Sequence, residues 1–146
     1  MQTGVLRACF LAFVLACESP TAPAARPGWV LRPSILLHNG VPAFLFAPVT
    51  VARDSLFGVG FTTFGPGCDE QGGTEVVVTG MTIEIVPMDW TPTTARTGAC
   101  PATVIQVFSR AVSVRFREAG EGVVRVMGRR EPGDDRVTFI ARVTVR

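Results

Sequence analysis

The chain contains no lysine, no tyrosine, one asparagine and one histidine among its 146 residues. All 14 of its basic residues are therefore arginine. Because lysine, tyrosine and asparagine have AT-rich codons, their scarcity indicates a GC-rich genome. The single histidine, His38, excludes multi-histidine metal sites and leaves any Ser-His-Asp mechanism dependent on one residue in a predicted turn. We therefore interpret His38 as a solvated turn residue.

The sequence also lacks an apolar run that could cross a bilayer. Its N-terminal apolar run, Ala8 to Ala16, has nine residues, whereas a spanning helix needs about 20. Arg7 is the only charge before this run. A basic start, a short apolar core and a small residue at the cleavage site are typical of a secretory signal. We predict that residues 1–16 are a signal peptide.

The signal ends in Val14-Leu15-Ala16-Cys17, which resembles the lipobox of bacterial lipoproteins. The resemblance implies that the Cys17 thiol is diacylated and that Cys17 becomes the new N-terminus. Glu18, where an aspartate would signal retention in some lipoproteins, gives no strong reason for inner-membrane retention. The alternative is an ordinary secreted protein, cut near Ala22-Pro23-Ala24 or between Ala24 and Ala25.

The mature chain has a short tether and one domain. Residues 17–28 contain three prolines, small residues and no apolar periodicity, which predicts an extended tether. The remainder, 29–146, has the length of one domain. The mature chain has 13 arginines against 12 acidic residues, so its net charge gives no argument for nucleic-acid binding.

Valine, threonine and phenylalanine dominate the second half of the chain, which favours strands. Residues 57–64 alternate strictly and predict a strand with Phe57, Val59 and Phe61 in the core. A turn at His38-Asn39-Gly40 separates two short strands, 35–37 and 41–46.

Residues 74–78 and 81–86 are also β-rich. They form either a hairpin or one long strand with a bulge at Gly80. Composition predicts loops over 65–73 and 87–101.

The last third of the chain predicts three strands, 111–117, 123–129 and 137–145, in an antiparallel meander with one wet face. Seven to nine short strands in this domain predict a two-sheet antiparallel sandwich.

The rhythm of these last strands is similar to the end of bacterial immunoglobulin-like domains. The lipobox, the tether, the stretch F-G-V-G-F-T-T-F-G-P-G-C and the terminal V-x-V-R hairpin look like small lipoproteins of GC-rich bacteria with no established activity. Unlike true immunoglobulin domains, the chain has no tyrosine for a tyrosine corner.

Four cysteines are present, of which Cys9 lies in the predicted signal and Cys17 is the predicted lipid site. Cys68 and Cys100 remain as an even pair, and an exported compartment favours a disulfide between them. In the chain-entropy model, closing a loop of about 33 residues stabilises the fold by roughly 3–4 kcal/mol. The alternative is a metal or redox pair, for which the sequence offers no nearby histidines.

Two features are candidate binding sites. Trp90 lies in the predicted 87–101 loop, where it either anchors a partner or folds back over the open end of the sandwich. Five arginines of the meander would share its wet face, with Arg115 opposite Arg125: Arg115, Arg117, Arg125, Arg129 and Arg142. Such a face suits an anionic partner such as lipid headgroups, lipopolysaccharide or an acidic protein patch. The alternative is that nearby glutamates neutralise it: Glu75, Glu84, Glu118 and Glu121.

The carboxylate pairs Asp69-Glu70 and Asp134-Asp135 match no calcium loop, so we interpret them as polar turns, and we predict no metal site or cofactor.

The sequence favours a non-enzymatic domain that is lipid-anchored in the bacterial cell envelope, on the periplasmic side or in the outer membrane. Its function would be binding or structural. One alternative is an immunoglobulin-like inhibitor of extracytoplasmic proteases. The other is a small carbohydrate-active hydrolase, for which no acid pair or nucleophile-base cluster is evident.

Overall fold

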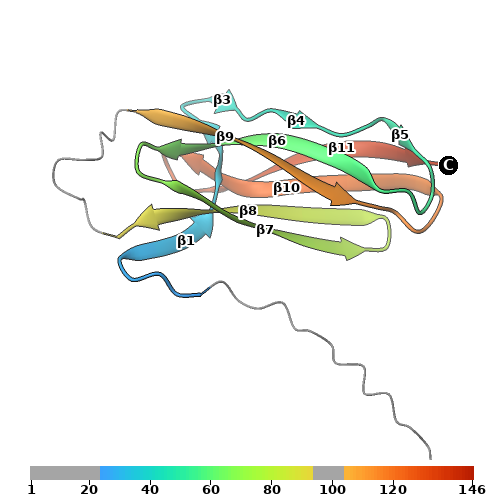
Figure 1. Cartoon of the computed structure of the whole chain (residues 1–146). Helices are drawn as coiled ribbons and strands as arrows, with labels where there is room; N and C mark the ends of the chain where they lie inside the picture. The colour runs from blue at the N-terminus through green and yellow to red at the C-terminus, as the bar shows by residue number, and fades with distance from the viewer. Residues whose placement is uncertain (1–23, 94–103) are drawn as a thin grey trace, which may run out of the picture.

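The computed structural model describes residues 24–93 and 104–146. These residues form eleven strands and no helix, which confirms the all-β prediction (Figure 1). The strands are β1 Trp29–Pro33, β2 Ile35–His38, β3 Val41–Pro42, β4 Leu45–Phe46, β5 Thr50–Val51, β6 Phe57–Pro66, β7 Glu70–Thr79, β8 Thr82–Pro92, β9 Ile105–Val114, β10 Gly120–Glu131 and β11 Arg136–Val145. The count exceeds the predicted seven to nine, because the segment 41–51 is divided into three two-residue strands.

All eleven strands belong to one curled sheet. On one side of the molecule, β7, β8, β10 and β11 lie side by side, with β8 and β10 parallel and the outer pairs antiparallel. On the other side, β6 pairs with β9 and β4. The short strand β2 joins the two sides, because it pairs with both β6 and β10.

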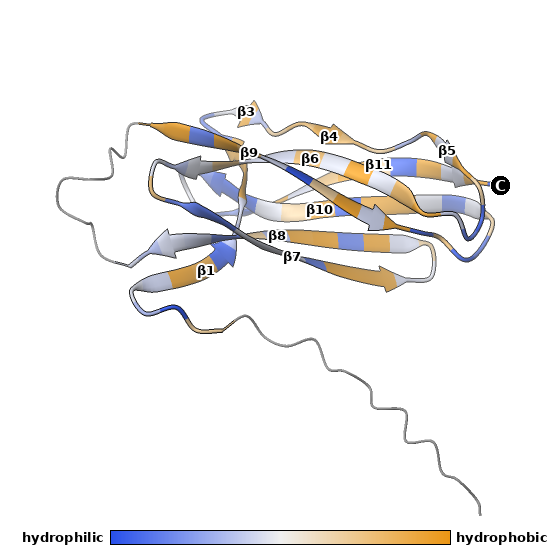
Figure 2. Cartoon of the chain, in the orientation of Figure 1, coloured by the Kyte–Doolittle hydropathy of each residue, from blue (hydrophilic) through white to orange (hydrophobic). Residues whose placement is uncertain are grey.

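The apolar core lies between these two sides (Figure 2). Alternate residues of β6 are buried as predicted: Phe57, Val59 and Phe61. They pack with buried residues of the facing strands, among them Ile83, Ile85, Val124, Val126 and Val143. Burying such a side chain contributes about 1.5–3 kcal/mol relative to leaving it exposed, so the alternation explains why the sheet closes on itself.

The predicted three-strand meander is wrong in one pairing. The hairpin of β10 and β11 forms, but β9 pairs with β6 along ten residues, from Phe57↔Val114 to Pro66↔Ile105. The link from β9 to β10 instead crosses the core through Phe116, which is buried and stacks on Phe57 with ring centroids 5.6 Å apart. Gly122 makes room for it, since a Cβ there would lie 2.5 Å from the Phe116 ring.

One predicted turn is confirmed, and at a second position the structure decides between two alternatives. Asn39 and Gly40 both have positive φ, 49° and 79°, as a two-residue turn between β2 and β3 requires. Thr79 pairs with Thr82 around Gly80, so β7 and β8 form a hairpin rather than one bulged strand.

The predicted loops 65–73 and 87–101 are wrong over most of their described residues. Gly72 and Gly73 lie inside β7, and β8 continues through Pro87 to Pro92. The register between β7 and β8 shifts between Gln71 and Thr74, and Pro87 pairs with Thr74 directly beside this irregularity. A proline is tolerated next to a bulge because the ladder is interrupted there and its missing N–H costs little.

Candidate functional site

Several predicted positions lie outside the described residues: the signal segment 1–16, Cys17 and Cys100. Lipidation of Cys17 therefore remains a prediction. Among residues 24–93 and 104–146, no helix is long and apolar enough to cross a membrane.

Cys68 lies in the short turn between β6 and β7 and is half-buried. Because Cys100 is not described, the disulfide between the two cysteines also remains a prediction.

Trp90 does not lie in a loop. It belongs to β8, where it pairs with Leu31 of β1 on one side and Glu70 of β7 on the other. Its side chain is half-buried on the sheet face opposite the core, because its neighbour Asp89 points inward. Held between two strands, Trp90 forms part of the sheet surface rather than a projecting anchor.

The predicted arginine face is not assembled. Arg125 lies on β10, whereas Arg115 and Arg117 follow the end of β9, which does not pair with β10. Arg125 forms an ion pair with Glu84 of β8 at 3.5 Å. The predicted pairing of Arg115 with Arg125 is therefore wrong, and β8 supplies one of the neutralising glutamates.

Arg115 and Arg117 lie instead near the C-terminus of the chain. There the backbone of Arg53 bonds to that of Arg146 at 2.7 Å, and the Asp54 N–H donates to the Phe116 carbonyl at 2.8 Å. This end carries exposed residues of both signs, Arg53, Arg115, Arg117 and Arg146 against Asp54 and Glu118.

His38 ends β2 and is more enclosed than predicted. Its Nδ1 lies 3.5 Å from Glu131 Oε2, and its ring faces Phe64 with centroids 6.0 Å apart. The pair Asp134-Asp135 lies in the β10–β11 turn and forms ion pairs with Arg129 and Arg130. Both observations give these residues structural roles.

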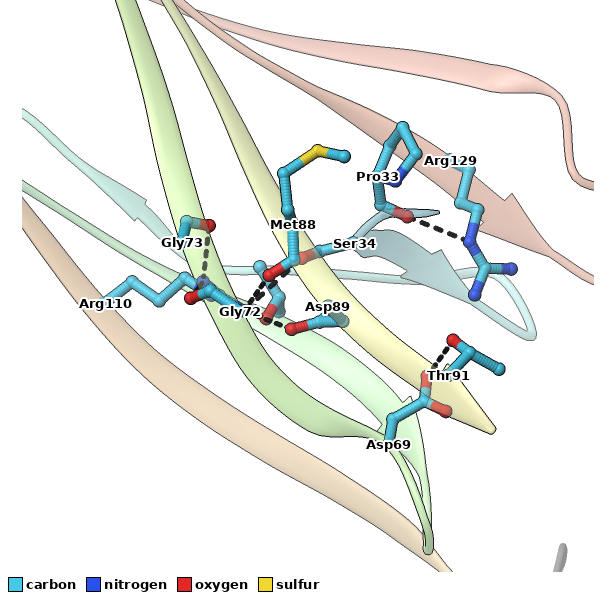
Figure 3. Close-up of polar contacts among 11 residues, drawn as sticks. Pro33, Ser34, Asp69, Gly72, Gly73, Met88, Asp89, Thr91, Arg110 and Arg129 are labelled. Atoms are coloured by element: carbon cyan, nitrogen blue, oxygen red, sulfur yellow. Dashed lines mark hydrogen bonds and ion pairs between the residues drawn. The ribbon is translucent and has the colours of Figure 1, made fainter. Parts of the chain in front are cut away.

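Strand β9 carries a buried charged group that was not predicted from the sequence, the guanidinium of Arg110 (Figure 3). Its side chain is 2% exposed, and it pairs with the 3% exposed side chain of Asp89 of β8. Its other hydrogen bonds go to Thr63 Oγ1 at 3.2 Å, Met88 O at 3.1 Å, Gly72 O at 3.3 Å, Ser34 Oγ at 3.4 Å and Gly73 O at 3.5 Å.

Arg110 thus joins both sides of the curled sheet. Its acceptors on β7 are the carbonyls of Gly72 and Gly73, where the register of β7 and β8 shifts. A bulge leaves backbone groups without a ladder partner, and the guanidinium satisfies two of them. Glycine at position 72 lets β7 lie close to β8 at the bulge, because a Cβ there would lie 2.7 Å from the Met88 carbonyl oxygen.

Burial governs the electrostatics of this cluster. It raises the pKa of the Asp89 carboxyl, against the opposing effects of the nearby Ser34 hydroxyl and the Arg110 charge. It lowers the pKa of Arg110, against the opposing charge of Asp89. With both side chains excluded from solvent, the pair has no access to a substrate, and we interpret it as structural.

The described residues also line two open depressions. The first, of about 280 Å³, lies where β1, β6–β7 and β8 end, and is lined by Trp29, Gly67, Cys68, Asp69, Glu70, Pro92 and Gln106. Asp69 is 4% exposed, and the Thr91 hydroxyl donates to its Oδ2 at 3.2 Å. Burial raises the pKa of Asp69, Thr91 opposes this rise, and the charge of Asp89 adds to it. The Glu70 carboxylate pairs with Arg26, which stacks over Trp29 at 4.0 Å. Both acids of this depression are thus already engaged.

The second depression is an apolar groove of about 500 Å³. It lies between the segment that contains β3 and β4 and strand β11, and is lined by Pro42, Ala43, Leu45, Thr138, Phe139, Ile140 and Ala141. Among these lining residues, Ile140 is 59% exposed. A contiguous apolar surface of this kind marks an interaction site more often than isolated exposed residues do.

Strand parity could have revealed the buried cluster. Arg110 has the same parity as Val112, Val114 and Phe116, and Asp89 has the same parity as Ile83 and Ile85. One predicted strand, 111–117, began just after Arg110, and the other, 81–86, ended before Asp89. Extending the alternation of each strand places Arg110 and Asp89 on the core face, where opposite charges must pair.

The chain matches no family model, no curated protein and no solved structure. Within residues 24–93 and 104–146, no group of three or more His, Cys, Asp or Glu side chains could hold a metal ion. The geometry described above is therefore the basis for a functional proposal.

Proposed function

We propose that this chain is a non-enzymatic binding domain, lipid-anchored in the bacterial cell envelope and built as an immunoglobulin-like two-sheet sandwich. In this proposal, the apolar groove between β4 and β11 binds an apolar segment of another envelope protein. The observation that carries the proposal is the groove itself, whose lining is apolar except for Thr138 and includes the 59% exposed Ile140.

The composition of the groove favours a protein partner. Its lining contains no charged side chain, which disfavours anionic lipid headgroups and lipopolysaccharide. The apolar residues Leu45, Phe139 and Ala141 form its floor and pack against the core. The lining also includes Phe139, and aromatic residues are enriched at the centres of protein interfaces.

The two alternatives receive less support from the described residues. A hydrolase would require an accessible acid pair, yet Asp69 is buried against Thr91 and Glu70 pairs with Arg26. A loop-based protease inhibitor would require a protruding apolar loop, but most of 65–73 lies in β6 and β7.

The anchor is tested by metabolic labelling with a palmitate analogue. Wild-type chain should incorporate the label, and Cys17→Ala should lose it. Incorporation that survives Cys17→Ala, or no incorporation in the wild type, would contradict the lipoprotein assignment.

The groove is tested with a photo-crosslinking residue at Ile140, which lines it, in intact cells. Val107 on β9 is the matched control, because both side chains are 59% exposed. We expect one discrete adduct with an envelope protein from position 140 and none from position 107. Equal adducts from both positions would indicate non-specific contact and would contradict the groove proposal.

A further inference from the structure

One half of strand β7 is an open, apolar sheet edge. Within the part of the chain that the structure describes, β7 pairs only with β8. Residues 74–79, T-E-V-V-V-T, contain one charge and no proline. Their three valines, Val76, Val77 and Val78, are 39%, 56% and 51% exposed.

Two of these valines face the same way as the core. Val76 pairs with Ile85 and Val78 with Ile83, and both isoleucines are fully buried. Paired residues of neighbouring strands share a sheet face. Val76 and Val78 are therefore core-facing positions whose outer side is uncovered because the sheet ends at β7.

Several other edges carry protection that this half of β7 lacks. Strands β3, β4 and β5 have two residues each. Pro42 lies in β3, and Pro48 lies between β4 and β5. Strand β9 carries the inward-pointing charge of Arg110. Short edge strands, prolines and inward charges are the features by which proteins prevent edge-to-edge association. Their absence from 74–79 indicates an edge that is used.

The direction of the free backbone groups follows from the hairpin. Thr79 and Thr82 are paired around the two-residue loop Gly80-Met81. In such a hairpin the pair next to the loop is joined by backbone hydrogen bonds, and so is every second pair along the ladder. Val77 and Glu75 therefore bond toward β8. The N–H and C=O groups of Val76 and Val78 point toward the open edge.

We propose that this edge pairs with the same edge of a second copy, antiparallel and centred on Val77. In that register, Val76 of each copy lies opposite Val78 of the other, and their outward backbone groups meet in four hydrogen bonds. Glu75 lies opposite Thr79. Parallel in-register pairing would instead place Glu75 against Glu75, and like charges directly opposite are destabilising.

The pairing also covers the exposed valines. It extends the core-facing row Ile83, Ile85, Val76 and Val78 across the two-fold axis, and brings the two Val77 side chains together on the outer face. The interface is isologous, so it closes at two copies. This proposal is independent of the groove between β4 and β11, which involves other strands.

Cysteine crosslinking of the full chain in its membrane tests the register. At the centre, the two residues 77 form a non-hydrogen-bonded pair with Cα atoms about 4.5 Å apart, within the range of a disulfide. Two residues 78 would be offset by two positions along the strands, with Cα atoms roughly 8 Å apart. Val77→Cys should therefore form a disulfide-linked dimer under mild oxidation, and Val78→Cys should not.

Mixing provides an internal control. Chains with Val76→Cys and chains with Val78→Cys should each stay uncrosslinked alone and form a mixed dimer together. No dimer from Val77→Cys, equal dimer from Val77→Cys and Val78→Cys, or dimer only from Val107→Cys on β9 would each overturn the proposal.

A charge variant tests the energetics. Val77→Arg places two guanidinium groups opposite each other at the two-fold axis, and we expect at least about a tenfold weaker dimer by sedimentation of the full chain in detergent. Circular dichroism would establish that the variant is folded. Unchanged association of a folded Val77→Arg chain would overturn the proposal, and if this variant does not fold, the cysteine series alone decides.

Discussion

The two halves of β7 differ in which partners they have besides β8. In residues 70–73, the ladder with β8 is interrupted, and the buried guanidinium of Arg110 donates hydrogen bonds to the Gly72 and Gly73 carbonyls. In residues 74–79, the ladder with β8 is regular and the outer edge carries three exposed valines. The first half, which we call the closed half, is hydrogen-bonded by a side chain of the same chain. The second half, which we call the open half, has an edge that can pair with another chain.

This difference has an energetic counterpart. The half at residues 70–73 depends on a buried charge pair. Removing one member of such a pair strongly destabilises the folded state. The open half depends on ladder hydrogen bonds and half-exposed valines, whose substitution on a surface changes stability little. Substitutions in the two halves should therefore separate stability from association.

The largest effect is expected from Arg110→Ala. It leaves the Asp89 carboxylate buried without its cation and the Gly72 and Gly73 carbonyls without a donor, so the free energy of unfolding should fall by about 3–5 kcal/mol. Urea denaturation measures it. The control is Arg125→Ala, which removes the exposed ion pair with Glu84 and should cost no more than about 1 kcal/mol. Equal losses from the two variants would contradict a structural role for the buried pair.

A smaller effect is expected from Gly72→Ala. The new Cβ would lie 2.7 Å from the Met88 carbonyl oxygen and 2.9 Å from Leu31 Cδ1. Backbone atoms must then shift, which costs about 1–3 kcal/mol. Gly73→Ala is the matched control, because nothing lies within 4 Å of a Cβ there. Thermal unfolding of both variants checks the bulge: similar melting temperatures would show that β7 can relax at Gly72.

The pH dependence of stability tests the acids near the closed half. Burial raises the pKa of Asp69 in the folded state above its ordinary value of 3.8. At pH values between 3.8 and the raised pKa, the folded state binds more protons than the unfolded state. The free energy of unfolding therefore falls as the pH rises through this range. For one proton the slope cannot exceed about 1.4 kcal/mol per pH unit.

Asp69→Asn removes this titration. Its free energy of unfolding, measured by urea denaturation from pH 4 upward, should decline less with pH than that of the wild type. The remaining decline reports Asp89, whose pKa is raised in the same direction. A wild type and an Asp69→Asn variant with parallel pH profiles would contradict the raised pKa of Asp69.

The smallest effect is expected from Val77→Thr in the open half. At protein concentrations at which the chain is monomeric, the free energy of unfolding should change by less than about 0.5 kcal/mol, because Val77 is 56% exposed and threonine also suits a strand. Urea denaturation at two protein concentrations makes the measurement. A loss above 1 kcal/mol at the lower concentration would show that this half is stabilised from within the chain after all.

Local patterns predicted much of the fold. The turn at Asn39-Gly40, the core face of β6 and the β10–β11 hairpin each follow from neighbouring residues, and each forms as predicted. The pairing of β9 with β6 could not be predicted in this way. Alternation determines which face of β9 is buried but not which strand lies beside it, and the crossing at Phe116 depends on the space that Gly122 leaves in another strand.

The candidate sites were harder to predict than the fold. Composition placed Gly72, Gly73 and Pro87 in loops, because glycine and proline usually interrupt strands. Here they accompany a bulge inside a long hairpin. The groove between β4 and β11 also has no local signal, since Leu45 and Phe139 are far apart in the chain and meet only in the folded sheet.

The single buried guanidinium of β9 also restricts which misfolded states are possible. If β9 slipped by one residue along β6, Arg110 would turn to solvent and Ser109 or Ala111 would take its place in the interior. Asp89 would then be buried with no counter-charge, at a cost that few apolar contacts could offset. A strand whose other residues are mostly valine, serine and alanine has little else to distinguish neighbouring registers. Arg110 therefore makes the native alignment of this sheet unique.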